Sequence, residues 1–291
     1  MKRFAYTLTF LLVVFSSTAQ SVFQRINWTL AWEDTFDSLN HAIWNIADYS
    51  DHYGDPQLYL KENVTTNNGL LYIIVNSDSA DCPKYPPQAI SGACGSCIEG
   101  MHTGTSGWIE TNIDHTTQFG YIESRMKMPY KSFYWPAFWT FEHTNTPSNA
   151  GEIDIFEMLG NKPSNVITMN LHTEYPDLKS HYKEKKMKNF SYTDWHTYGV
   201  KWTEKDMVWY IDGKKVYKVS QHNITDSVRI IINLAINRWN KPPISAEYAD
   251  TMFVDYVKVY KQVPTNELYR KSSDAITRNE KTTPWRKPKR K

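Results

Sequence analysis

Strand-like runs of apolar and polar residues dominate the chain, and no long amphipathic helix or internal repeat interrupts them. These runs cover residues 70–75, 121–128, 208–211, 215–217, 228–236 and 253–260. Between 208–211 and 215–217 stands Asp212-Gly213, a dipeptide that favours a tight hairpin turn. Many short strands joined by polar turns predict an all-β domain built from two packed antiparallel sheets.

The two ends of the chain differ from this pattern. Residues 1–20 combine a basic start, an apolar run at 10–15 and small residues at 16–19, which predicts an export signal and a secreted protein, extracellular or periplasmic. The alternative is a membrane anchor, but the run is short for a permanent span. Residues 21–262 form the predicted domain, and the polar, basic residues 263–291 are expected to be a disordered tail.

Net charge is divided unevenly along the sequence. Residues 270–291 carry nine Lys or Arg and two Asp or Glu, whereas the body without the basic start carries 22 basic and 29 acidic residues. A mildly acidic body argues against nucleic acid as a partner. Beyond the signal region, no segment is long and apolar enough to form a membrane span, and we expect a monomer.

Residues 78–106 are rich in Pro, Gly and Cys and show little strand character. Cys82, Cys94 and Cys97 are the only cysteines. In an exported protein we favour a disulfide from Cys82 to Cys94 or Cys97, which leaves one thiol. A zinc site that adds His102 is the alternative.

Three acidic residues stand inside one apolar strand pattern, at Glu152, Asp154 and Glu157. Residues two apart on a strand share a face, so Glu152 and Asp154 point the same way while Ile153 and Ile155 point into the core. Glu157 has the opposite parity in a regular strand. A β-bulge at 155–156 restores it to the face of the other two acids.

Such a row of carboxylates predicts glycoside hydrolysis. One carboxylate attacks the anomeric carbon, and a second protonates the leaving oxygen and later activates water. An acidic strand edge without a function is the alternative. The chain is 14% aromatic, with 11 Trp and 19 Tyr. Flat aromatic faces suit sugar rings, although any single Trp is more often a core residue.

The acidic segment is similar to the catalytic signature of glycoside hydrolase family 16, in its bulged form Glu-x-Asp-x-x-Glu. Further landmarks of that family follow in order over residues 28–261: 32–37 (WEDTFD), 119–129 (FGYIESRMKMP), 135–139 (WPAFW), 195–198 (WHTY), 209–213 (WYIDG) and 252–260 (MFVDYVKVY). The resemblance implies a concanavalin-like jelly-roll sandwich of two antiparallel sheets, with a substrate cleft on the concave face.

The resemblance also implies roles. Glu152 is expected to be the nucleophile, Glu157 the acid/base and Asp154 their assistant, with Trp135 and Trp139 along the cleft. Some family members bind a structural calcium, here through the backbone of Gly69 and the carboxylate of Asp255. We expect no cofactor to be required for catalysis, and Asp255 is equally readable as an ordinary surface acid.

Three further residues are candidate substrate contacts. The family's glucanases usually have a Gly-Gly pair after Asn-Leu-Ala, whereas residues 233–240 here are NLAINRWN. Arg238 and Trp239 therefore reshape the cleft and offer a cation to an anionic sugar, or belong to a surface loop. His172, on the strand expected after the catalytic one, is either a substrate contact or a structural histidine.

The sequence therefore predicts a secreted, retaining, endo-acting glycosidase. Its substrate is a β-1,3-glucan of the laminarin type or an algal galactan. A lectin-like sugar-binding protein and a transglycosylase on the same fold are the alternatives. The paired acid and base argue against a pure binding protein.

Overall fold

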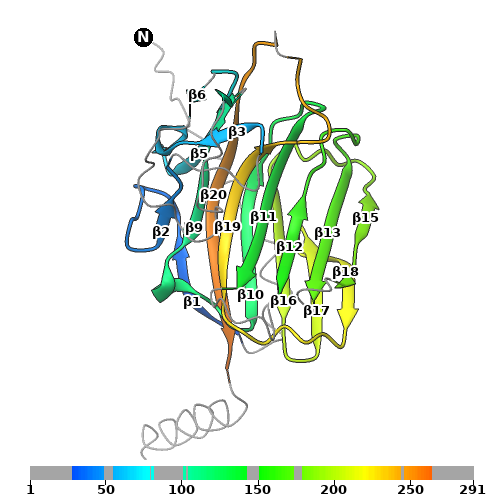
Figure 1. Ribbon diagram of the computed structural model, residues 1–291. Coiled ribbons are helices and arrows are strands. Elements are labelled where there is room, and N and C mark those ends of the chain that lie inside the picture. The colour runs from blue at the N-terminus through cyan, green and yellow to red at the C-terminus, as the bar shows by residue number, and fades with distance from the viewer. Residues whose placement is uncertain are drawn as a thin grey trace, which may run out of the picture.

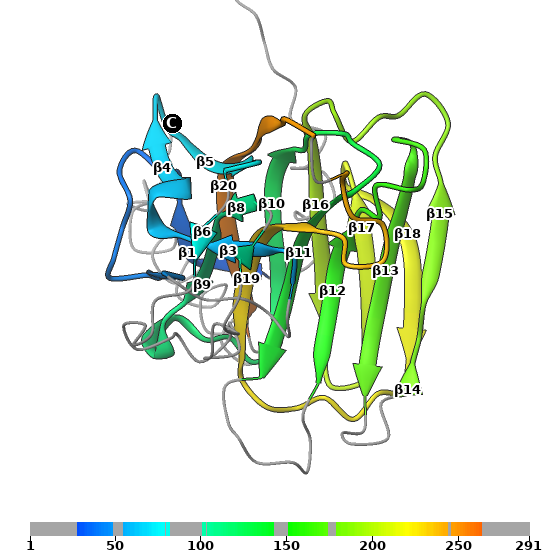
Figure 2. The ribbon, with the colours of Figure 1, turned by 45° about the horizontal axis from the view of Figure 1, so that its top comes forward.

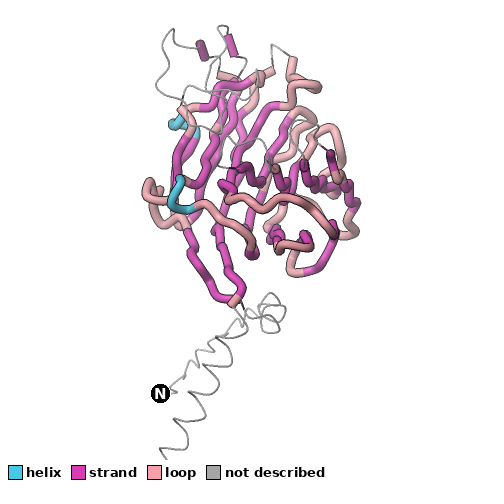
Figure 3. Tube along the Cα trace, turned by 60° about the horizontal axis from the view of Figure 1, so that its bottom comes forward, coloured by secondary structure: helices cyan, strands magenta, loops and turns pink. Residues whose placement is uncertain are grey.

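The computed structural model describes residues 28–48, 55–78, 80–81, 101–102, 104–142, 151–173, 179–243 and 246–263. Their regular structure is almost entirely strand, with two short 3-10 helices, η1 (Lys61–Asn63) and η2 (Ile113–His115) (Figure 3). No helix among them is long and apolar enough to cross a membrane. The expected export signal, the cysteines and the basic tail from 264 lie outside the described residues. Expectations about these segments and about the domain boundaries stay predictions.

Two sheets make up the body, as the strand pattern predicts. The first contains β1 (Trp28–Asp34), β3 (Gln57–Tyr59), β4 (Val64–Asn67), β5 (Leu70–Asn76), β8 (Gly104–Ser106), β10 (Gly120–Lys127), β16 (His196–Trp202), β17 (Asp206–Ile211), β18 (Lys214–Ser220) and β20 (Ala249–Gln262). The second contains β2 (Trp44–Ile46), β9 (Trp108–Thr111), β11 (Tyr134–Glu142), β12 (Glu152–Glu157), β13 (Val166–Thr173), β14 (Lys179–Ser180), β15 (Lys183–Lys186) and β19 (Val228–Ile236). β6 (Ala80–Asp81) and β7 (Met101–His102) pair separately.

Strands far apart in sequence are neighbours in both sheets. The first sheet has the order β18-β17-β16-β10-β20-β5-β8-β3, and the second β14-β13-β12-β11-β19-β9-β2. Figures 1 and 2 show β19, β11, β12 and β13 side by side in one layer, with the strands of the first sheet behind them. Among the described strands, all pairings are antiparallel except that of β3 with β8. This crossing connectivity is that of the expected jelly-roll sandwich.

The main core lies between the two layers because each strand turns alternate residues inward. From the first sheet come fully buried residues such as Ile122 and Val259, and from the second Phe138, Ile153 and Ile232. A smaller apolar cluster lies on the other side of the second sheet. It consists of Ala47, Tyr59, Trp108, Ala137, Trp139 and Ile231.

The predicted hairpin at Asp212-Gly213 is confirmed. β17 pairs with β18 across this turn, and Asp212 and Gly213 have φ values of 49° and 70°. Positive φ at both central residues defines the turn type that matches the twist of two antiparallel strands. The strand predictions for 70–75, 121–128, 228–236 and 253–260 are also confirmed.

The expectation of little strand character over residues 78–106 is wrong for the last residues of that segment. Gly104–Ser106 form β8, a buried strand between β3 and β5. Small and polar residues hide this strand from a hydrophobicity pattern because the space is tight. A Cβ atom at Gly104 would lie 2.3 Å from the Tyr248 hydroxyl and 2.7 Å from the Asn76 carbonyl oxygen, and Ser106 donates a hydrogen bond to the Leu234 carbonyl.

Candidate active site

The predicted bulge lies in β12, between Asp154 and Glu157. Asp154 pairs with Asn170 on β13, whereas Glu157 pairs with Thr168, so two residues on β12 lie opposite one on its partner. The register to β11 shifts at the same place. Ile155 and Phe156 are both buried in the main core, which leaves Glu157 on the face of the other two acids.

Side chains satisfy the backbone carbonyls on both sides of the bulge. The indole N–H of the fully buried Trp209 on β17 reaches across the sandwich and donates to the Asp154 carbonyl over 2.8 Å. The Thr168 hydroxyl donates to the Glu157 carbonyl over 2.7 Å. Because an unpaired buried carbonyl is costly, these two bonds hold the irregular strand in one conformation.

The three carboxyl groups stand together in the cleft, and each resists ionisation. Burial raises the pKa of Glu152 well above its usual value, and the charge of Asp154 adds to the effect. Burial also raises the pKa of Asp154, with the charge of Glu157 as the next cause. The pKa of Glu157 is raised by burial as well. Carboxyl groups this close titrate as a group, because the ionisation of one disfavours the ionisation of the next.

The cleft over the second sheet brings together six of the predicted site residues: Trp135, Trp139, Glu152, Asp154, Glu157 and Arg238. Its lining also includes Asp55, Trp108, Ala137, Asn233 and Ala235. Trp135, Ala137 and Trp139 alternate along β11, so their shared parity turns them all to the cleft. The aromatic floor continues from Trp139 to Trp108, whose rings meet edge to face at 5.4 Å.

One tryptophan contacts the proposed acid/base directly. The indole N–H of Trp135 donates to Oε1 of Glu157 over 2.8 Å. This bond stabilises the charged carboxylate and lowers the pKa of Glu157 against the larger effect of burial. Trp135 therefore adjusts the proton affinity of Glu157 in addition to offering a face to a sugar ring.

Replacing Trp135 with phenylalanine keeps an aromatic face and removes the donor. The pKa of Glu157 should rise, so its acid form should persist to higher pH. We expect the alkaline limb of kcat/KM against pH to move upward by about half a unit to one unit. Trp239→Phe is the matched control, since that indole makes no hydrogen bond to Glu157. An unchanged limb in Trp135→Phe, or an equal shift in both variants, would contradict this role.

A chain of hydrogen bonds fixes Trp139 and ends at Arg238. The indole of Trp139 donates to Oδ1 of Asn233 over 2.8 Å, and Nδ2 of Asn233 donates to the Tyr59 hydroxyl over 3.1 Å. That hydroxyl donates in turn to Asp55 over 3.5 Å. Asp55, whose side chain is 4% exposed, forms an ion pair with Nη2 of Arg238 at 2.8 Å.

The segment after β19 thus lies at the cleft rather than in an unrelated surface loop. Trp239 is 75% exposed, and its ring lies 5.4 Å from that of Trp135 at an angle of 39°. The guanidinium of Arg238 lies 5.6 Å from the Trp239 ring centroid. Trp135 and Trp239 therefore form an aromatic pair at the rim of the cleft, next to Glu157.

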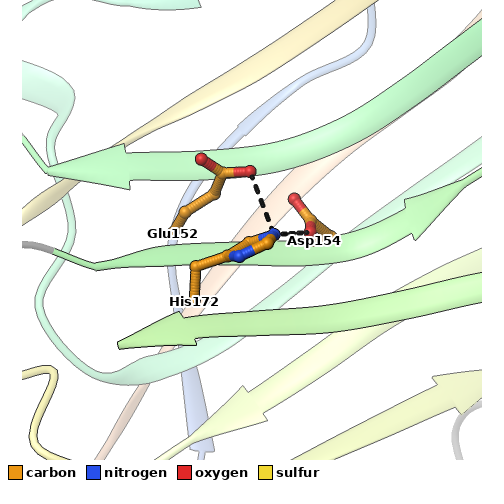
Figure 4. Close-up of side chains that lie close together, drawn as sticks. All are labelled: Glu152, Asp154 and His172. Carbon is orange, nitrogen blue, oxygen red and sulfur yellow. Dashed lines mark ion pairs between the residues drawn. The ribbon is translucent and has the colours of Figure 1, made fainter. Parts of the chain in front are cut away.

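His172 lies against the carboxylate row (Figure 4). Its Nε2 atom is 3.3 Å from Oδ2 of Asp154 and 3.7 Å from Oε1 of Glu152. In the part of the chain that the structure describes, these three form the only group of acids or histidines with the spacing of a metal site. Because Nε2 already lies 2.8 Å from the side-chain nitrogen of Asn170, it is not open to an ion.

The residues expected to bind calcium lie in the first sheet, away from the cleft. Gly69 is in the turn between β4 and β5, with φ of 69°. Oδ2 of Asp255 lies 2.6 Å from Nη1 of Arg125, so a guanidinium already neutralises this carboxylate. The donor set fits a calcium ion poorly unless Arg125 moves away. Structural calcium stays a prediction, and no step below depends on it.

Sequence reasoning did not single out Trp108, Asn233 or Ala137. The sequence carried a local signal for two of them: Ala137 alternates with Trp135 and Trp139, and Asn233 begins the segment that contains Arg238. Trp108 reaches the cleft from β9, which pairs with β19 across more than a hundred residues of sequence. No local pattern predicts that pairing.

The comparisons agree with this geometry. The glucan endo-1,3-beta-glucosidase A1 of Niallia circulans is 28% identical over 272 residues, which cover 80% of this chain and 38% of that protein. The glucan endo-1,3-beta-glucosidase of Cryptopygus antarcticus is 28% identical and is covered to 91%. The endo-beta-1,3-glucanase structure from Pyrococcus furiosus superposes with a TM-score of 0.68 at 25% identity, covering 81% of this chain and 95% of that one.

This chain spans only about a third of the length of the first curated relatives it matches. The match to the family itself is broad. A family model described as glycosyl hydrolases family 16 matches residues 60–258, more than half of the chain, and that range includes the bulged strand and its three acids. The chain therefore belongs to glycosyl hydrolase family 16.

Proposed function

We propose that the chain is an endo-acting hydrolase of a neutral β-1,3-linked glucan and that it works by a retaining double displacement. The observation that carries this proposal is the row of Glu152, Asp154 and Glu157 on one face of a bulged strand, at the floor of a Trp-lined cleft. Two of the relatives above are named for endo action on 1,3-β-glucan.

In the first step, Glu152 attacks the anomeric carbon as the bond to the leaving sugar breaks. Glu157 gives its proton to the leaving oxygen, and a glycosyl ester forms on Glu152. Burial raises the pKa of Glu157 and so favours the protonated form that the acid needs. Asp154, between the two, disfavours a second negative charge on its neighbours and so couples their proton changes.

In the second step, the deprotonated Glu157 takes a proton from water, and the oxygen of that water attacks the same carbon. The ester bond breaks, and Glu152 regains its negative charge. Each displacement inverts the anomeric centre, so the product keeps the β configuration. A sugar hydroxyl in place of water gives transglycosylation by the same residues.

The ion pair of Arg238 with Asp55 supports a neutral substrate. A free guanidinium in the cleft would suit a sulfate or carboxylate group. Here Asp55 lies 2.8 Å from Nη2 of Arg238 and also accepts a hydrogen bond from Gln57 over 3.0 Å. The positive charge is thus balanced within the protein, and the pair serves to fix the wall of the cleft.

Replacing Asp55 with asparagine tests that reading. The change keeps the shape but removes the balancing charge, so the variant should bind a sulfated galactan about fivefold more tightly than the wild type, which corresponds to about 1 kcal/mol. Binding of laminarin should not improve. Affinity electrophoresis at two salt concentrations measures both. Gln57→Glu, which adds a negative charge beside Asp55, should have the opposite sign. No change in sulfated-galactan binding by Asp55→Asn would contradict a neutralising role.

The proposed function is tested by a reducing-end assay of the purified protein on laminarin, mixed-linkage glucan, agarose, porphyran and carrageenans. We expect cleavage of laminarin, with oligosaccharides of several lengths early in the reaction, as endo action produces. Tight binding to one polysaccharide without cleavage of any would favour a lectin-like protein. Cleavage confined to porphyran or carrageenan would overturn the neutral-glucan assignment.

Secretion and a monomeric state complete the proposal. The export-signal pattern of residues 1–20 supports the first. Signal-peptide cleavage near Ala19 or Gln20, read by N-terminal sequencing of the protein recovered from culture medium, tests it.

A further inference from the structure

The side-chain amide of Asn170 stands between a backbone donor and the ring of His172. Asn170 lies on β13, is 5% exposed and pairs with Asp154 in the neighbouring strand. Its Oδ1 accepts hydrogen bonds from the Leu171 backbone N–H over 2.9 Å and from the Ser180 hydroxyl over 2.8 Å. Its Nδ2 lies 2.8 Å from Nε2 of His172.

These bonds fix which end of the amide faces the histidine. A backbone N–H is always a donor, so the atom that contacts the Leu171 N–H must be the amide oxygen. The NH2 group therefore points at Nε2 of His172, and Nε2 must accept. A neutral imidazole that accepts at Nε2 carries its proton on Nδ1. A doubly protonated ring would set two donors against each other across 2.8 Å.

The tautomer of His172 determines what the ring presents to the carboxylate row. Nε2 of His172 presents a lone pair 3.3 Å from Oδ2 of Asp154, and that buried oxygen has no hydrogen-bond partner among the described residues. An ionised Asp154 would set a second lone pair against the first. In this neutral form the ring gives the row no hydrogen bond and no positive charge, whereas a protonated His172 lowers the pKa of Glu152 and Glu157. The groups facing the ring are Glu152 and Asp154 on β12, with Glu157 beyond the bulge.

We propose that Asn170 is a positioning residue that holds His172 in the neutral tautomer with its proton on Nδ1, so that the proton needed for catalysis stays on the carboxylate row. This inference rests on the proposed function for its catalytic meaning, and the tautomer itself is independent of it. A doubly protonated His172 would instead place a positive charge beside the row and lower the pKa of Glu157, so the acid would lose its proton at lower pH.

The direct test is nuclear magnetic resonance of the whole protein labelled with ¹⁵N in its histidines. Long-range ¹H–¹⁵N correlations distinguish a protonated from an unprotonated ring nitrogen, and a His172→Gln spectrum assigns the signal. We expect His172 to show a protonated Nδ1 and an unprotonated Nε2 at neutral pH. A proton on Nε2 in the wild-type protein would overturn the proposal, whether or not any variant folds.

Asn170→Asp is the informative variant because it keeps the size of the side chain and still accepts from Leu171 and Ser180. It places a carboxylate oxygen against Nε2, so a proton should move there. The histidine spectrum should then show a protonated Nε2, which a purely structural role for Asn170 would not produce. Ser180→Ala is the matched control: it removes one donor to Oδ1 and leaves the Leu171 N–H, so the tautomer should not change.

The outcomes separate clearly. A folded Asn170→Asp variant with an unchanged histidine spectrum would overturn the proposal. The spectrum is recorded without substrate, so it tests the tautomer independently of activity. Failure to cleave any polysaccharide would count against the proposed function and would not change the tautomer assignment.

Discussion

Replacing Glu152 with glutamine should lower kcat on the cleaved polysaccharide by about 10⁴-fold or more. An amide of the same shape cannot form the glycosyl ester, whereas the Trp-lined cleft around it is unchanged. The dissociation constant for the polysaccharide should therefore change by less than about threefold. Stopped reducing-end assays and isothermal titration measure the two quantities.

A second variant distinguishes a nucleophile from a structural acid. In Glu152→Ala, added azide can take the place of the carboxylate and attack an aryl β-glycoside from the α face, which yields an α-glycosyl azide in one inverting step. Glu33→Gln is the control, since Glu33 pairs with Lys258 on the first sheet, away from the cleft. Near-normal turnover in Glu152→Gln would remove Glu152 from the mechanism.

Replacing Glu157 with glutamine should have an effect that depends on the leaving group. On polysaccharide, which needs a proton on its departing oxygen, we expect a loss of about 10³-fold, within the range of general acid catalysis. On an aryl glycoside with an acidic phenol, the glycosyl ester should still form and then accumulate, visible as a burst of phenol.

Azide again gives the decisive contrast. In Glu157→Ala, the ester on Glu152 forms first, and azide then attacks it from the β face, so a β-glycosyl azide results. The two alanine variants should therefore yield azides of opposite configuration. The reverse assignment of products would exchange the roles of Glu152 and Glu157, and identical products would contradict a double displacement.

The parity of Glu157 made the bulge predictable. Three acids in an apolar strand pattern cannot share a face without one extra residue, and β12 contains that residue at the expected place. The side-chain hydrogen bonds that hold the bulge were not predictable. Trp209 and Thr168 satisfy its carbonyls from another sheet and another strand, and neither position shows a signal in the sequence around residues 152–157.

At the wall of the cleft, too, some residues were predictable from sequence and others were not. Trp135 and Trp139 follow from the alternation of one strand, whereas the pairing of Asp55 with Arg238 joins residues far apart in the chain. From sequence alone, Arg238 was open to an anionic substrate. The structure gives it a buried partner within the protein, and only a three-dimensional arrangement shows such compensation.

The central claim is that the bulged strand turns Glu152 and Glu157 toward one anomeric carbon, so that two successive inversions occur there. Proton nuclear magnetic resonance of the first products, recorded before mutarotation, tests it most directly. The account predicts that the new reducing ends appear as the β anomer and only later equilibrate. Initial appearance of the α anomer would mean a single displacement by water and would contradict the account.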